Sequence, residues 1–296
     1  MHPAPSLIAF TTLSGAGFGF LFFLGLGFPD VSGWVALGYF ALAYLLAGGG
    51  LLASIFHLGH PERALRAFTQ WRSSWLSREA WASVATLGVM AAYGAGLVFF
   101  DTRLAALGVP GAALALGTVF TTAMIYAQMR PVPRWHSPLT PALFLVLSLA
   151  GGALFASQTL AAQALLVAAL PLQVAWWITG DRRLAGSGTD MGTATGLGAR
   201  ERLRAFEPPH TGPSYLSREM MHVVGRRHAT RLRVIAMILM VVLPLVLLLP
   251  PFGKFGAGLA ALVHLAGVAV SRWLFFAQAE HVVGFYYGKD ADSAAR

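Results

Sequence analysis

Eight long apolar runs occupy most of this sequence, and each is about 20 residues long. A helix needs about 20 consecutive apolar residues to cross the hydrocarbon core of a bilayer. The runs are unbroken, whereas the strands of a membrane barrel would alternate apolar and polar residues. We therefore predict an all-α, polytopic integral membrane protein that forms one membrane domain over residues 1–296. The expected helices lie at about 5–28, 33–57, 79–100, 105–129, 139–157, 159–180, 232–252 and 255–280.

The composition excludes a water-soluble globule. Hydrophobic residues make up 56% of the chain and charged residues only 11%, whereas soluble domains carry about 25% charge. The first apolar run has no basic segment before it and no small-residue cleavage site after it, so we expect it to stay as a membrane span. Because the chain has no cysteine, it cannot hold a disulfide, a thiolate-bound iron-sulfur cluster, a c-type haem or a cysteine-bound zinc ion.

Basic residues lie between the apolar runs and favour one side of the membrane. The second, fourth and sixth connections hold sixteen Lys and Arg residues, and the odd-numbered connections hold two. This bias predicts a protein of the cell inner membrane whose basic connections and both termini are cytoplasmic. The net charge of +9 is thus explained by topology, and nucleic acid is not an expected partner.

A hexapeptide occurs twice with one exchange. The segment 74–79 reads SWLSRE and the segment 214–219 reads SYLSRE. A parallel duplication of two four-helix halves would place both copies on the basic side. The alternative is a shared helix-start signal, in which a serine caps the helix and an early glutamate meets the positive end of its dipole.

Glu79 and His57 are the strongest candidates for chemistry. Each stands at the membrane end of an apolar run, on the basic side. Ionisable groups at membrane depth are costly and usually functional. We expect this pair to exchange protons with a quinone, while an interfacial histidine and a helix-start acid remain the alternative.

The residues around this pair resemble a known family. HLGHPERA over 57–64 and WLSRE over 75–79 are similar to the DmsC family, the membrane anchor subunits of dimethyl sulfoxide reductase-type molybdoenzymes. Weaker similarity covers WHSPLTP at 135–141 and RWLFFA at 272–277. The resemblance implies eight helices, no cofactor held by this chain, and quinone chemistry coupled to an iron-sulfur subunit and a molybdopterin catalytic subunit. It also matches His57 and Glu79 to the family's quinone-site histidine and glutamate, and His60 is a second histidine in that segment.

Other polar residues are weaker candidates. Six residues could contact the quinone ring or its oxygens, although the aromatic ones could equally be interfacial anchors: His60, Trp71, Trp75, Arg78, Tyr126 and Gln128. The extramembrane basic segment 181–231 and the fourth connection predict a docking surface for the partner, with anionic lipid as the alternative. The arginines concerned are Arg130, Arg134, Arg200, Arg202, Arg204, Arg226 and Arg227.

These features predict a subunit that exchanges electrons between ubiquinone or menaquinone and a docked iron-sulfur subunit. Orientation and resemblance together favour quinone reduction coupled to sulfite oxidation, as in cytoplasm-facing sulfite dehydrogenases, over quinol oxidation for dimethyl sulfoxide reduction. We expect no metal site in this chain. Two other classes stay open: a secondary transporter and a b-type haem protein. A haem would need two histidines at similar depth; only His264 lies deep in the membrane, whereas His57 and His281 could form a pair near the basic side.

Overall fold

The computed structural model describes residues 3–56, 58, 60–198, 203, 206–207, 228–251 and 253–286. Over these ranges the chain is helical and contains no strand. The all-α, polytopic prediction is confirmed. The first group of long helices is α1 (Pro5–Gly25), α2 (Gly33–Ile55), α3 (Trp75–Phe99) and α4 (Ala105–Ala127). The second group is α5 (Leu139–Phe155), α6 (Thr159–Arg183), the continuous segment α9 (Ala229–Met237), η4 (Ile238–Val242) and α10 (Leu243–Leu247), and α11 (Gly253–Ala277).

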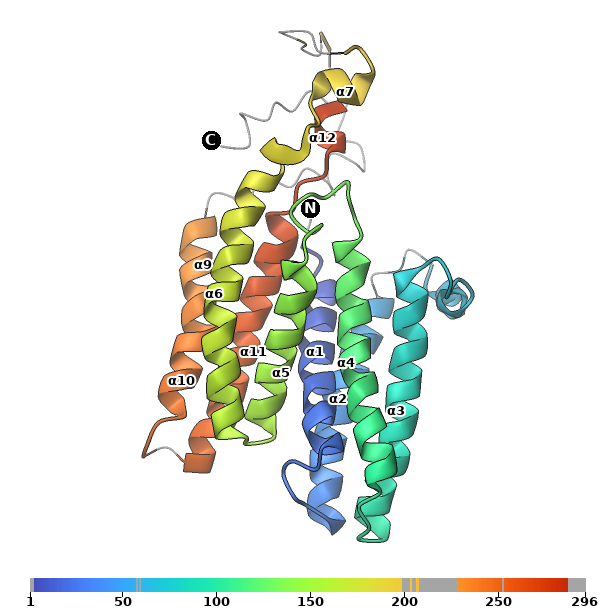
Figure 1. The fold of residues 1–296 in the computed structure, drawn as a ribbon, viewed down its shortest axis with the longest axis vertical. Coiled ribbons are helices and arrows are strands. Elements are labelled where there is room, and N and C mark those ends of the chain that lie inside the picture. The colour runs from blue at the N-terminus through green and yellow to red at the C-terminus, as the bar shows by residue number, and fades with distance from the viewer. Residues whose placement is uncertain are drawn as a thin grey trace.

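The long helices lie roughly side by side along one axis (Figure 1). Helix α1 is central, because it packs against α2, α4, α5 and α11, and much of its length is buried. The buried side chains form one apolar core that extends through both groups. The bundle therefore has the architecture of a membrane domain, with apolar residues also on its outer surface.

The connections α2–α3, α4–α5 and α6–α9 all leave and rejoin the long helices at one end of the bundle, at the top of Figure 1. We call this the basic end, because the sequence places most of its arginines in these connections. The short helices described at this end are η1 (Pro61–Phe68), η2 (Ala185–Ser187), α7 (Met191–Thr195) and α12 (Val283–Tyr286).

The helix boundaries differ from the expected ones in a few places. In the described ranges, seven helices are long and apolar enough to cross a membrane, and α5 is an additional, shorter apolar helix that is not one of these seven. Eight membrane crossings therefore remain a prediction. Helix α3 begins at Trp75 rather than near Glu79, because helix geometry continues through the polar residues before the apolar run. The second hexapeptide, at 214–219, lies outside the described residues, so the duplication also stays a prediction.

The segment α9–η4–α10 is a single span interrupted by a π-helical turn. Pro244 follows this turn and carries no N–H, so it cannot donate to the carbonyl of Met240, four residues before it. His264 of α11 supplies a donor instead, because its Nδ1 lies 2.7 Å from that carbonyl oxygen. The buried histidine thus stabilises an irregular turn of the neighbouring helix.

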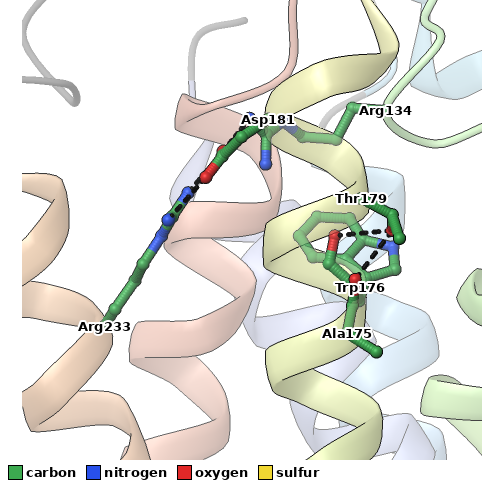
Figure 2. A network of polar contacts seen from close by, with 6 residues as sticks. All are labelled: Arg134, Ala175, Trp176, Thr179, Asp181 and Arg233. Carbon is green, nitrogen blue, oxygen red and sulfur yellow. Dashed lines mark hydrogen bonds and ion pairs between the residues drawn. The ribbon is translucent and has the colours of Figure 1, made fainter.

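The buried Arg134 forms an ion pair with the partly exposed Asp181 at the basic end (Figure 2). Arg134 of the α4–α5 connection donates to Asp181 of α6 at 2.6 Å, and Arg233 of α9 donates to the same carboxylate at 2.7 and 2.8 Å. Only 9% of the Arg134 side chain is exposed. Burial lowers the pKa of Arg134, and the hydrogen bond with Asp181 opposes this effect. The Arg134 guanidinium thus joins the fourth connection to α6, and Asp181 links both to α9; the docking role predicted for Arg134 stays a prediction.

Candidate functional site

Glu79 lies inside the bundle in the second turn of α3. Its exposed fraction is 4%, and its Oε1 accepts a hydrogen bond from the hydroxyl of Thr122 on α4. Helix α3 starts at the basic end, so this carboxyl group lies close to that end. Among the described residues, no Lys or Arg nitrogen forms an ion pair with the Glu79 carboxylate within 4.0 Å. Glu79 is therefore a buried carboxyl group held by a neutral partner.

Hydroxyl groups continue from Glu79 along the contact between α3 and α4. Thr86 and Thr118 lie with their Oγ1 atoms 2.9 Å apart, and both residues are fully buried. Thr122 was not predicted as a site residue. The sequence did carry a signal, because Thr118, Thr122 and Tyr126 recur at every fourth position and so share one face of α4.

Tyr126 lies one turn beyond Thr122, in an aromatic cluster that joins the two groups of helices. Its ring centroid lies 5.2 Å from that of Trp135 and 5.3 Å from that of Phe275. The Arg272 guanidinium lies 3.4 Å from the centroid of the Phe144 ring. The Tyr126 ring lies 5.9 Å from the same Phe144 ring, so Tyr126 and Arg272 belong to one cluster, and only 6% of Tyr126 is exposed.

A separate pocket of about 320 Å³ lies on the outer side of α3 and is lined by Trp71, Arg78 and Trp81. Arg78 is fixed there, since it donates to the carbonyls of Trp71 and Arg72 at 3.0 and 2.7 Å. Two of these pocket residues were predicted quinone contacts, and Trp81 was missed because it falls within an apolar run. Residues 78 and 81 point to a different face of α3 from Glu79, because they are displaced by one and two positions along the helix.

Trp75 stands between this outer pocket and Glu79. It precedes Glu79 by one helical turn on the same face of α3. The centroid of its ring lies 4.4 Å from the guanidinium carbon of Arg78 and 6.0 Å from the ring centroid of Phe120 on α4. Ser77 anchors the preceding connection by donating to the Ala67 carbonyl and accepting from the backbone N–H of Gln70 at 3.1 Å. The first two turns of α3 therefore carry residues of the surface pocket on one face and the buried carboxyl group on another.

The structure does not bring all predicted site residues together. His60 is 65% exposed and lies 2.9 Å from the carboxylate of Glu62, outside the bundle. Gln128 and Arg130 are exposed at the end of α4. The predicted proton carrier His57 lies outside the described residues, as do the docking candidates Arg200, Arg202, Arg204, Arg226 and Arg227.

The geometry bears on the other predicted classes. Both ring nitrogens of His264 face backbone carbonyls, that of Met240 and, at 3.4 Å, that of Leu147. This histidine is thus engaged within the bundle and not directed at a haem iron. His281 accepts a backbone hydrogen bond from Val283 through Nδ1 at 3.0 Å. Among the residues that the structure describes, no group of three potential ligands could hold a metal ion.

Comparisons with known proteins agree with the resemblance noted in the sequence. The model of the family described as DMSO reductase anchor subunit (DmsC) matches residues 1–278. The chain is 33% identical to a sulfite dehydrogenase subunit from Allochromatium vinosum, over 97% of this chain and 99% of that protein. It is 30% identical to anaerobic dimethyl sulfoxide reductase chain YnfH of Escherichia coli, over 53% of this chain and 57% of that one. No solved structure is a significant match.

Proposed function

Because this chain belongs to the DmsC family of DMSO reductase anchor subunits, we propose that it exchanges electrons between a membrane quinone and an iron-sulfur subunit docked at the basic end. The chain is a membrane anchor subunit of an oxidoreductase complex. The proposed complex also contains a molybdopterin catalytic subunit and lies in the cell inner membrane. Its proposed overall reaction is quinone reduction coupled to sulfite oxidation, by analogy with the relative named as a sulfite dehydrogenase subunit.

The observation that carries this proposal is the buried carboxyl group of Glu79. Reduction of a quinone to a quinol takes up two electrons and two protons, so a quinone site needs a group that can supply protons. Glu79 is 4% exposed, accepts a hydrogen bond from Thr122 and lies one turn from the Trp75 ring. A carboxyl group in such surroundings can hold a proton or release it to a nearby acceptor. We assign proton transfer to Glu79 and, with it, to His57, and ring contacts to Trp75.

Electron transfer requires that the docked subunit lie near the same end. Five arginines of the segment 181–231 supply the positive charge that we assign to docking: Arg200, Arg202, Arg204, Arg226 and Arg227. Opposite charge on a partner would steer it to this surface and fix its orientation. The quinone site and the docking surface then lie at the same end of the bundle. This arrangement is needed because electrons transfer efficiently only over a short distance.

The test is replacement of Glu79 by Gln in the whole complex, with Glu62→Gln as the matched control. Glu62 is 65% exposed and lies in η1 at the same end, so the control makes the same chemical change outside the bundle. Sulfite-dependent reduction of a short-chain quinone should fall about 100-fold or more in Glu79→Gln, the size of a typical acid–base contribution. Glu62→Gln should retain the rate of the unmodified complex.

Sulfite-dependent reduction of ferricyanide separates quinone chemistry from assembly, because this acceptor takes electrons from the extramembrane subunits. It should be unchanged in both variants. Normal quinone reduction by Glu79→Gln would refute the assignment of Glu79. Absence of any sulfite oxidation in the unmodified complex, with quinol-dependent reduction of dimethyl sulfoxide, would instead reverse the proposed direction.

A further inference from the structure

A groove of about 560 Å³ opens at the basic end, between the α4–α5 connection and the last turn of α6. Its polar lining comes from Arg130, His136, Thr179, Arg182, Arg183 and Ser187. A volume of this size is in the range of small-molecule sites. The quinone and docking assignments above leave Arg182 and Arg183 without a role.

Within the described residues, three guanidinium groups of the groove have no carboxylate partner. No ion pair in this part of the chain involves Arg130, Arg182 or Arg183. The carboxylate that α6 carries here, Asp181, is already shared by two other arginines (Figure 2). The groove therefore concentrates positive charge that an anion would neutralise.

The groove is also ordered by contacts with the backbone. Arg183 donates through Nη1 to the carbonyl of His136 at 2.5 Å. His136 in turn lies with Nδ1 2.7 Å from the carbonyl oxygen of Ala127, so its ring donates from that nitrogen. These bonds fix one wall while other N–H groups of Arg183 stay available for a ligand.

An apolar stripe leads from the groove along the outer face of α6. Leu170, Val174 and Ile178 are exposed and follow one another at every fourth position, and Arg182 continues the same series. Residues four apart lie on one face of a helix. A ligand with a charged head at Arg182 would therefore have its tail against the surface of a membrane-spanning helix.

We propose that this groove binds the phosphate headgroup of an anionic phospholipid, with the acyl chains along Leu170, Val174 and Ile178. Guanidinium groups bind phosphate oxygens through paired hydrogen bonds, and basic pockets between transmembrane helices are suited to anionic headgroups. An acidic peptide of a partner subunit would neutralise the arginines, yet it would leave the apolar stripe unused. The proposal assigns Arg130 to lipid binding rather than to docking.

The experiment uses the whole complex, purified in mild detergent and depleted of lipid. The groove variant is Arg130→Gln with Arg182→Gln and Arg183→Gln. The control variant is Arg63→Gln with Arg66→Gln and Arg72→Gln, which removes three exposed arginines from the second connection at the same end. Native mass spectrometry measures lipid binding while phosphatidylglycerol or phosphatidylcholine is titrated.

We expect the unmodified complex and the control variant to bind phosphatidylglycerol in preference to phosphatidylcholine. Each arginine near a membrane surface contributes enough binding energy for about a 5-fold effect, so the groove variant should bind about 100-fold more weakly. Inorganic phosphate should not compete at the same phosphorus concentration. The single variant Arg182→Gln, which leaves the backbone-bonded Arg183 in place, should show the 5-fold effect even if the triple variant does not fold.

Three results would overturn the proposal. Unchanged phosphatidylglycerol binding by the groove variants would show that the lipid binds elsewhere. Full competition by inorganic phosphate would identify a site for soluble anions. Loss of the iron-sulfur subunit from Arg130→Gln or Arg182→Gln, with lipid binding retained, would identify a protein-docking surface.

Discussion

The close contact between α1 and α5 gives the sharpest test of the packing. Gly19 of α1 faces the backbone of α5 so closely that a methyl group in its place would overlap the carbonyl oxygen of Ser148. That oxygen belongs to a helix backbone, so no side-chain rotation can relieve the overlap. Gly19→Ala therefore requires the two helices to separate by roughly 1 Å or more, which opens the close-packed core around them.

Two opposing terms set the size of the effect. Overpacking of this kind costs about 1–3 kcal/mol, while the higher helix propensity of alanine returns up to about 1 kcal/mol. Because the overlap is with helix backbone, we place the overpacking cost at the upper end of its range, which leaves a net loss of about 2 kcal/mol. This loss corresponds to a melting temperature lower by about 5 °C for a chain of this size. The matched control is Gly88→Ala on α3, where a methyl group would meet no atom within 4 Å, so this variant should melt no lower than the unmodified protein.

The measurement is a thermal melt of each purified variant in the same detergent, followed by size-exclusion chromatography. Gly19→Ala should lose its monodisperse peak at a lower temperature than Gly88→Ala. Equal melting of the two variants would show that α1 and α5 can separate without cost. The central position of α1 in the bundle would then have to be reconsidered.

Three further outcomes are expected. Asp181→Asn removes the counter-charge of the buried Arg134 and should cost about 2 kcal/mol in a thermal melt. Burial lowers the pKa of His281, so the folded state favours the neutral form of this side chain. Stability should therefore be lost as the pH falls from 7 through the ordinary histidine pKa of about 6.5 and below. Thermal melts at pH 5 and pH 7 should show that His281→Gln removes this dependence. The chain has no cysteine, so single cysteines can be labelled selectively in intact cells. Positions 73 and 157 are exposed at opposite ends of the bundle. A membrane-impermeant thiol reagent should label Ser157→Cys and not Ser73→Cys.

Much of the fold follows from the pattern of apolar runs, since each expected span contains a membrane-length or shorter apolar helix, although most of these helices end a few residues before the expected boundary. Hydropathy marks where a helix can enter the hydrocarbon core and not where helix geometry stops. For this reason α3 begins at Trp75, before its apolar part, and α6 continues through Asp181 to Arg183. The π-helical turn before Pro244 was readable in principle, because proline always removes a backbone donor.

The candidate site was only partly accessible from the sequence. Glu79 could be selected because a charged residue at the start of an apolar run is costly to bury. Its partner Thr122 is 43 positions away along the chain, so the contact depends on how α3 and α4 pack. The burial of Arg134 could not be predicted for the same reason. Its position between two apolar runs suggested a loop, but its partner Asp181 lies on α6, 47 positions away along the chain.

The placement of the site has a consequence for energy coupling. Glu79 lies near the basic end, and the proposed docking surface lies at the same end. If protons for the quinone come through Glu79 and electrons come from the docked subunit, both reach the quinone from one side of the membrane. Each turnover then moves no net charge across the bilayer, because the two electrons and two protons cancel. Turnover in sealed vesicles should accordingly be insensitive to an imposed membrane potential. If protons instead came from the opposite end of the bundle, they would cross part of the bilayer, and a potential that opposes their movement would slow turnover.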